Sequence, residues 1–411
     1  MNYELFIAKR IIASKQHKNS VSSPIIKISI LAIAIGIIVM LFSVATGVGL
    51  QKKIKEKISG FNGDIQIINY DSNNSKVTVT PVYMHQDFYP DFESVSNVKK
   101  VQVYATKAGI IRTPDEFEGI ILKGVDQDYD WSFFKEYLMI GKLPEIGSKI
   151  SNEVLISAKT AARLRLKLGD DFHIFFVKND PNKAPNSRKF TVCGVFNSGF
   201  EEFDEAFMIG DIKHIQRINK WEEDQVGGFE VFVHEFDQLR QTGFAVYEQI
   251  DPSLNAYTIA EKFPAIFEWL SLFDTNIIVI IAIMILIAGI NMITALLVLI
   301  LERTQMIGIL KALGNHNWSI RKIFLYNAAF LIGKGLFWGN LIGIGLLLIQ
   351  KYFGVITLNP ETYYVNQAPV HLSIPALIWI NLGTLLLCIL MLIVPSFIVS
   401  KISPVKAIKF D

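Results

Sequence analysis

The chain has 411 residues, of which 51% are hydrophobic and only 19% are charged, and its mean hydropathy is +0.35. This apolar content excludes an ordinary water-soluble protein and indicates a membrane protein. The formal net charge of +2 excludes the strongly basic surface typical of nucleic-acid-binding proteins. Cys193 lies in a strand-like pattern and Cys388 in an apolar run, so we expect neither a disulfide nor a zinc site.

The first 23 residues have the pattern of an amphipathic helix that lies on a membrane surface, with apolar and basic side chains interleaved. These side chains are Leu5, Phe6, Ile7, Lys9, Arg10, Ile11, Ile12, Lys15 and Lys18. Pro24 can start a helix whose apolar stretch, residues 25–46, is long enough to cross a bilayer of about 30 Å. Residues 43–45 (SVA) would suit signal-peptide cleavage, but the apolar run exceeds the usual ~7–15 residues, so we favour an uncleaved anchor.

Three further apolar runs raise the predicted number of transmembrane helices to four, which we place at 24–46, 274–301, 323–349 and 374–400. Basic residues gather before the first helix, in segment 302–322 and in the tail 401–411, whereas loop 350–373 has only Lys351. The positive-inside rule therefore places both termini and segment 302–322 in the cytoplasm. Segments 47–273 and 350–373 then face the other side.

The long insert 47–273 changes from helical to alternating periodicity, which predicts an α+β domain. The predicted strands are 64–70, 76–82, 101–106, 120–124, 153–157, 171–177, 190–196 and 229–233. The clearest helices are 158–168, which Gly169 can end, and 212–219. Strand-rich stretches near both ends could pair around a central insertion, so we allow for two lobes.

Residues 302–314 (ERTQMIGILKALG) form a short helix between the second and third membrane helices. Met306, Ile309, Leu310 and Leu313 recur at helical spacing and should share one face, on which Gly308 and Ala312 would leave a low spot. Gly314 offers a helix stop, and a new helix begins near Trp318. Such a helix either packs at the membrane interface or docks a partner.

The residues of this helix resemble the cytoplasmic coupling helix of the mechanotransmission ABC permeases, which act in lipoprotein release, macrolide export and cell division. The matching positions are Glu302, Arg303, Ile307, Gly308, Ile309, Leu310, Lys311, Ala312, Leu313 and Gly314. The predicted contacts with the ATPase are Glu302, Arg303, Met306, Gly308, Ile309, Leu310, Lys311, Leu313 and Gly314. Further matches resemble the LolC/LolE lipoprotein-releasing permeases over most of the chain. They are 6–10 (FIAKR), Gly36, 47–49 (GVG), 156–157, 161–170, 190–196, 203–204 and 403–408, while Leu50 stands where that family commonly has Phe.

The resemblance implies a non-catalytic permease subunit of a bacterial inner-membrane transporter, which a separate ATPase drives through the coupling helix. The chain contains no GxxxxGK[ST] loop, so we expect ATP and Mg²⁺ to bind the partner ATPase and no cofactor to bind this chain. The other implied partners are a second permease copy or a paralogue, a lipoprotein substrate, membrane lipid and a periplasmic lipoprotein carrier. Nucleic acid is not among them.

Two sets of residues are candidates for contact with cargo and carrier. Apolar stripes flanking the insert would either pack in the core or contact acyl chains, and they comprise Leu50, Ile54, Ile58, Phe263, Phe267 and Leu270. The polar loop 178–188 joins two strands and is either a plain hairpin connection or, by resemblance, a hook that recruits the carrier. Its candidate residues are Asp180, Pro181, Pro185 and Arg188.

The third membrane helix contains a ridge of Gly335, Gly339 and Gly343, which favours close helix packing over ligand contact. Lys334 beside it would either extend toward the cytoplasmic surface or line a cavity.

Two other functions remain open at this point: efflux of a peptide or drug, and regulation of a cell-wall hydrolase by a membrane protein that relays the state of an ATPase.

Overall fold

A computed structural model of the chain describes residues 3–13, 22–71, 79–113, 116–176, 178 and 185–403. The chain divides into two compact units. The helical unit comprises Met1–Gln51, Trp269–Thr357 and Gln367–Asp411, and the inserted domain comprises Lys52–Glu268 together with Leu358–Asn366. Part of the predicted loop 350–373 therefore belongs to the inserted domain, which the sequence did not indicate.

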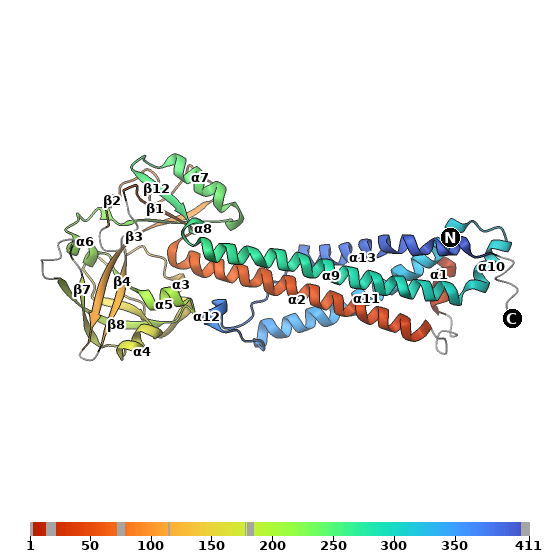
Figure 1. Cartoon of the computed structure of the whole chain (residues 1–411). Coiled ribbons are helices and arrows are strands. Elements are labelled where there is room, and N and C mark those ends of the chain that lie inside the picture. Colours follow the sequence, from red (N-terminus) through yellow and green to blue (C-terminus); the bar gives the residue numbers. More distant parts are fainter. Residues whose placement is uncertain are drawn as a thin grey trace. The chain divides into compact units, whose positions relative to one another are not determined.

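The helical unit is built around four long helices that run along one another (Figure 1). They are α2 (Ser22–Asn62), α9 (Pro264–Glu302), α11 (Asn317–Phe353) and α13 (Ile374–Ser396). All four are long and apolar enough to cross a membrane, which confirms the prediction of four spans. At about 1.5 Å per residue, the 41 residues of α2 and the 39 of α9 far exceed a bilayer core of about 30 Å. Both helices therefore continue beyond the membrane.

The glycine ridge of α11 packs directly against α2. A Cβ added to Gly335 would lie 2.7 Å from Ile33 Cβ, and one added to Gly339 would lie 2.8 Å from Ile37 Cβ. These separations leave no room for a methyl group, so only glycine lets the two backbones approach this closely. The prediction that this ridge serves helix packing is confirmed.

Polar side chains fasten α11 to α13. Asn340 and Asn381 donate to each other at 2.6 and 3.0 Å, while Arg321 Nε donates to Ser396 Oγ at 3.0 Å and its guanidinium lies 3.6 Å from the ring centroid of Phe397. Lys334 is exposed beside this packing and its Nζ lies 4.8 Å from the ring centroid of Phe330, one turn earlier. The Lys334 side chain thus extends toward the N-terminal end of α11, as it would if it reached for the cytoplasmic surface. The role of Lys334 stays a prediction.

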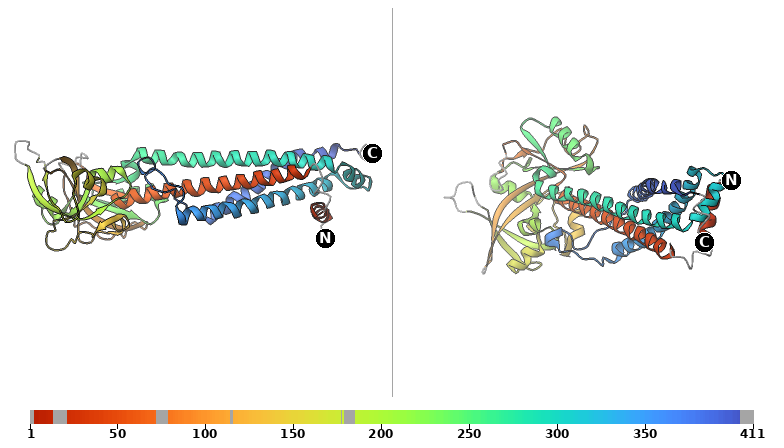
Figure 2. Two further views of the ribbon diagram at one scale, coloured as in Figure 1. Left: turned by 90° about the horizontal axis from the view of Figure 1, so that it is seen from below. Right: turned by 45° about the vertical axis from the view of Figure 1, so that its right-hand side comes forward.

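The short helices of the helical unit include α1 (Tyr3–Ala13), α10 (Thr304–Ala312) and α14 (Ile398–Lys401). The predicted surface helix at the N-terminus is present as α1, and residues 14–21 lie outside the described part of the chain. Figure 2 shows α1 as a separate short helix close to the start of α11. Ala8 and Ile11 of α1 pack against Ile323 of α11.

The inserted domain is organised around one ten-stranded sheet of order β12-β1-β11-β3-β4-β9-β6-β8-β5, with β7 pairing β3 and β8. A separate pair is formed by β2 and β10. The strands are β1 (Ile65–Asn69), β2 (Val82–Tyr83), β3 (Val98–Arg112), β4 (Phe117–Val125), β5 (Leu138–Gly141), β6 (Glu153–Ser157), β7 (Asp171–Phe176), β8 (Asn186–Phe196), β9 (Phe207–Asp211), β10 (Gln225–Val226), β11 (Gly228–Val233) and β12 (Leu254–Thr258).

The two ends of the insert pair with each other, as predicted. β1, near the start, hydrogen-bonds to β11 and β12, near the end. The long strand β3 joins the two halves of the sheet, because its first part pairs with β11 and its later part with β4 and β7. The core between sheet and helices includes Ile67, Leu122 and Ile156, which are fully buried.

The inserted domain also contains short helices, of which α12 lies between α11 and α13 in the chain. They are α3 (Ser132–Tyr137), α4 (Ala158–Leu164), α5 (Glu201–Ala206), α6 (Lys213–Asn219), the 3-10 turn η2 (Phe236–Gln238), α7 (Leu239–Gln249), α8 (Ile259–Lys262) and α12 (Pro360–Tyr363). The predicted helix 158–168 is shorter than expected, because Arg165 already adopts a left-handed conformation with φ of 53°. Of the predicted strand 76–82, residues 76–78 are outside the described part, and only Val82 is in a strand.

Candidate coupling helix and contact sites

Helix α10 is a separate element between two membrane helices. It begins directly after Arg303 and ends at Ala312, where Gly314 has a φ of +88°. Gly314 N–H donates to Lys311 O at 3.0 Å and Asn315 N–H to Leu310 O at 3.1 Å, which is the Schellman pattern of helix ends. The predicted stop at Gly314 is confirmed, and α11 begins at Asn317, close to the predicted Trp318.

The exposed face of α10 is narrower than predicted. Ile309 and Leu313 are 48% and 79% exposed, but Met306 and Leu310 are partly buried against the rest of the helical unit. Gly308 is buried, so it offers no low spot to a partner. The four apolar residues were predicted to share one face, and the structure leaves only part of that face exposed, because α10 also buries apolar surface against its own chain.

Helix α1 explains why two of the four residues turn inward. Its buried residues Ala8 and Ile11 form a cluster with Ile323, and Met306 and Leu310 pack against that cluster. The side chain of Asn315 also donates to Tyr3 Oη at 3.1 Å. The spacing of Ala8 and Ile11 in the sequence is a signal for such a buried stripe, but it does not say which helix covers it.

Lys311, the charged residue of α10, holds this helix in place. Lys311 Nζ donates to the carbonyl oxygens of Ile402 at 2.8 Å and Ser400 at 3.2 Å, and burial lowers the pKa of this ammonium. It thus bonds the last turn of α14. Glu302 is exposed at the end of α9, and Arg303 is half-buried in the link to α10. The structure therefore gives Lys311 an internal contact that the sequence could not reveal.

The apolar stripes predicted as cavity walls are mostly packed. Leu50, Ile54, Ile58 and Leu270 are at most 5% exposed. Phe263 and Phe267 are half-buried and lie 6.1 and 6.0 Å from the rings of Phe203 and Phe236, respectively. The four aliphatic residues are therefore packed in the core and the two phenylalanines are partly covered, and contact with acyl chains stays a prediction.

The hook candidates are only partly described. Asp180 and Pro181 lie outside the described residues, whereas Pro185 is exposed and Arg188 is half-buried on β8. Next to the loop, the register places Phe117, Arg112, His173 and Lys189 in one row across β4, β3, β7 and β8. All four side chains of this row are exposed.

Two grooves, of about 370 and 650 Å³, share Arg112, Thr113 and Glu116 in their linings. The larger one combines these polar residues with apolar side chains, and its full lining is Ile110, Arg112, Thr113, Glu116, Phe117, Phe175 and Pro185. We call the row together with this groove the basic–apolar face. It brings Pro185 of the predicted hook beside residues that the sequence did not single out, because cross-strand register is not visible in one strand at a time.

A buried ion pair fixes the end of α2 in the inserted domain. Lys123 and Glu230 are 2% and 1% exposed and lie 2.7 Å apart, and Lys123 Nζ also donates to the carbonyl of Phe61. Gln102 donates to Glu230 at 3.1 Å, and the Tyr129 ring centroid lies 5.7 Å from Lys123 Nζ. Burial lowers the pKa of Lys123, and the Glu230 carboxylate opposes that shift.

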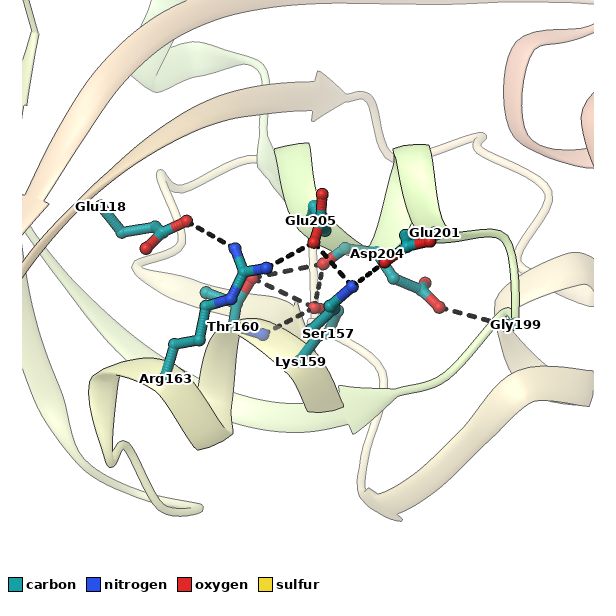
Figure 3. Close-up of polar contacts among 9 residues, drawn as sticks. All are labelled: Glu118, Ser157, Lys159, Thr160, Arg163, Gly199, Glu201, Asp204 and Glu205. Carbon is teal, nitrogen blue, oxygen red and sulfur yellow. Dashed lines mark hydrogen bonds and ion pairs between the residues drawn. The ribbon is translucent and has the colours of Figure 1, made fainter. Parts of the chain in front are cut away.

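A second polar cluster joins α4 and α5, as Figure 3 shows. Lys159 pairs with Glu201 and Glu205, and Arg163 pairs with Glu205 and, at 2.9 Å, with Glu118. These pairs are partly exposed, so each contributes little to stability by itself.

Asp204, on the buried side of α5, fixes the loop before that helix. Its carboxylate accepts hydrogen bonds from Ser198 Oγ at 2.7 Å and from Gly199 N–H at 3.0 Å. Burial raises the pKa of this carboxyl, and the bonds from Ser198 and Gly199 oppose the shift. The sequence motif Phe203-Asp204 is thus a structural support in this domain.

Family profiles match both parts of this architecture. The MacB-like periplasmic core domain matches residues 28–240, and the FtsX-like permease C-terminal domain matches residues 278–404. The chain belongs to the FtsX-like permeases with a MacB-like periplasmic core domain. It is therefore an ABC-transporter permease and a membrane protein whose inserted domain is of the periplasmic type.

Several relatives of this permease match along nearly their whole length. The lipoprotein-releasing system transmembrane protein LolC of Xylella fastidiosa is 20% identical, with 96% of each chain covered. The LolE protein of Haemophilus influenzae is 18% identical with 99% of each covered, and an uncharacterized membrane protein of Buchnera aphidicola is 25% identical with full coverage. Among solved structures, the periplasmic region of MacB from Actinobacillus actinomycetemcomitans is 13% identical with a TM-score of 0.34, covering 51% of this chain and 95% of that one.

Proposed function

We propose that this permease is the membrane subunit of an ATP-driven transporter that releases lipoproteins from the inner membrane to a periplasmic carrier. The observation that carries the proposal is the end-to-end match to LolC and LolE proteins, which are named for lipoprotein release. The chain would be non-catalytic, with ATP and Mg²⁺ bound by a separate ATPase. It would act beside a second permease, either a second copy or a paralogue.

The exposed part of α10 is the proposed ATPase contact. Ile309 and Leu313 lie one helical turn apart and present apolar side chains to solvent, a pattern typical of helix-in-groove docking. Lys311 fastens α10 to α14, and Arg321 fastens α11 to the end of α13. A push on α10 would therefore move α11 and α13 as well, which is the behaviour that mechanical coupling to ATP hydrolysis requires.

The basic–apolar face, together with Pro185, is the proposed contact for the carrier. Arg112, His173 and Lys189 stand directly opposite one another across three strands. Lys189 pairs with the carboxylate of Asp171 at 2.8 Å, whereas the guanidinium of Arg112 offers donors that an anionic group over the row could bond. The 78% exposed ring of Phe117 adjoins them. A carrier surface that combines acidic and apolar side chains would satisfy both features.

The distribution of basic residues supports the orientation of the permease. Both termini and α10 would face the cytoplasm, where the ATPase obtains ATP, and the inserted domain would face the periplasm.

Depletion of the permease followed by membrane fractionation tests the proposal. We expect lipoproteins to accumulate in the inner membrane within a few generations. Altered drug susceptibility with normal lipoprotein sorting would instead favour efflux, and chains of undivided cells would favour control of a cell-wall hydrolase. Either of these outcomes would overturn the proposal.

A further inference from the structure

The segment Leu358–Asn366 is a part of the inserted domain that comes from the loop between two membrane helices. It lies between α11 and α13 in the chain, yet it belongs to the compact inserted domain. Its ends are held together by the hydrogen bond from Leu358 N–H to Asn366 O at 3.0 Å, and it contains α12. The backbone of this segment therefore connects α11 and α13 to the inserted domain.

Lys57 of α2 reaches this segment. Its side chain is almost fully buried, and its Nζ donates to the carbonyl oxygen of Tyr364 at 2.8 Å and to that of Ser198. One ammonium group thus links three pieces of backbone: the first long helix, the segment between the third and fourth, and the loop that follows β8. Lys53, one turn earlier on that helix, pairs instead with the carboxylate of Glu136 at 2.8 Å.

The loop that follows β8 is shaped to accept this ammonium group. Gly199 has a φ of +65°, and a Cβ added there would lie 3.1 Å from Lys57 Nζ. The Asp204 carboxylate accepts the N–H of Gly199 at 3.0 Å and holds the loop in this conformation. The charged groups that act on Lys57 from the elements around it are Lys53, Asp204 and Glu136.

Aromatic stacking forms a second contact between segment 358–366 and the loop that follows β8, and we call these contacts together the junction. The rings of Tyr364 and Phe200 stack with centroids 4.5 Å apart, and Phe200 stacks in turn on Phe203 at 4.4 Å. Tyr364 adopts a φ of +58°, a region that residues with a side chain rarely occupy. Such a conformation persists only where surrounding contacts hold it, and Lys57 supplies one by bonding the Tyr364 carbonyl.

We infer that Lys57 is a positioning residue that passes movement of the third and fourth membrane helices to the inserted domain through Tyr364 and Ser198. The inference rests on the proposed transport function, because movement of these helices is what coupling to an ATPase would produce. A buried ammonium group that bonds carbonyls suits this task, since its hydrogen bonds are directional and can be broken and remade without unfolding the core.

The test compares three variants of the full permease, each co-purified with its ATPase and reconstituted in lipid nanodiscs. Lys57→Met keeps the stem and removes the ammonium, Lys57→Arg keeps the charge, and Lys52→Met alters an exposed lysine of the same helix as the matched control. Readouts are ATP hydrolysis, transfer of a fluorescent acylated lipopeptide to the carrier, and hydrogen exchange of residues 358–366 and 197–200 with and without ATP.

We expect Lys57→Met to retain ATP hydrolysis while transfer falls by about tenfold or more, which corresponds to the loss of a charge-assisted hydrogen bond. Exchange of 358–366 should rise and no longer respond to ATP. Lys57→Arg should restore most of the transfer and the ATP response, and Lys52→Met should match the wild type. Transfer and ATP response at wild-type level in Lys57→Met would overturn the inference.

The exchange measurement separates this inference from the transport proposal. If the wild type transfers no lipopeptide, lipoprotein release fails as the function, but ATP-dependent exchange of 358–366 that Lys57→Met abolishes still supports the role of Lys57. If Lys57→Met does not assemble, hydrogen exchange of the wild type alone provides the test. Exchange rates of 358–366 and 197–200 that change together on adding ATP would support the role of Lys57, and a change in only one of the two segments would overturn it.

Discussion

Helix α10 and the inserted-domain end of α2 differ in which side chains they expose to solvent and which they bury. On α10, the apolar side chains of Ile309 and Leu313 are exposed although they would gain from burial. At the end of α2, charged groups such as Lys57 and Lys123 are buried although they would gain from water. The exposed apolar pair is the surface proposed for the ATPase, whereas the buried charges are already bonded within the chain.

The largest effect should come from breaking the buried ion pair. Lys123→Met leaves the Glu230 carboxylate buried without its cation, so we expect the free energy of unfolding to fall by about 3–5 kcal/mol. Urea unfolding of the full permease in detergent measures this change. The double variant Lys123→Met/Glu230→Leu should recover much of the loss, and a single variant within about 1 kcal/mol of wild type would refute the assignment of a fixed joint.

The exposed pair on α10 should matter for the partner and not for folding. Leu313→Glu places a charge on a side chain that is 79% exposed, so we expect ATPase affinity to fall at least about tenfold while unfolding is unchanged. Leu310→Glu should lower both, because Leu310 packs against the cluster of Ala8, Ile11 and Ile323. Titration of the ATPase against permease in nanodiscs measures the affinity of both variants, and thermal unfolding measures their stability. Equal losses of stability in the two variants would contradict the distinction between the exposed Leu313 and the packed Leu310.

A third comparison sharpens the account of helix packing. Gly339→Ala should destabilise the permease by about 1–3 kcal/mol, because the new Cβ would lie 2.8 Å from both Ile37 Cβ and Ala34 O. Gly345→Ala on the same helix has open space at the new atom and should be neutral or stabilising by up to about 1 kcal/mol. Thermal unfolding in one detergent compares them, and equal shifts would contradict the close contact of α11 with α2.

The smallest effect concerns pH. His214 is 3% exposed, its Nε2 lies 2.9 Å from Ser151 O, and burial lowers its pKa below the ordinary value. As pH falls below about 6.5, the unfolded chain binds a proton that the folded chain does not, so His214 makes the permease less stable toward acid. The difference in unfolding free energy between wild type and His214→Gln should therefore change between pH 7 and 5, and a constant difference would contradict this burial effect.

Much of this architecture is visible in the sequence. The apolar runs predict all four membrane helices, and alternation in 64–70 and 229–233 predicts strands that do pair across the insert. The short strands β5, β9 and β12 escaped prediction, because four or five residues without clear alternation carry too little periodic signal. The stop at Gly314 was predictable because a left-handed residue at a helix end favours glycine.

The candidate sites were less predictable, because their contacts are non-local. Helical spacing placed Met306 and Leu310 on the docking face, yet α1, which lies some 300 residues earlier, covers them. Similarly, nothing near Lys57 in the sequence points to Tyr364, although Lys57 Nζ lies 2.8 Å from the Tyr364 carbonyl. A periodicity shows which side chains can lie together on one element, but the fold decides which of them another element covers.

The central claim is that α10 meets an ATPase in the cytoplasm while the inserted domain works on the opposite side of the membrane. Leu313→Cys and Phe117→Cys test it, since both positions are highly exposed while Cys193 and Cys388 are buried. With a membrane-impermeant maleimide on intact spheroplasts, we predict labelling of Phe117→Cys at once and of Leu313→Cys only after the membrane is opened. Labelling of both cysteines from the same side would contradict the account.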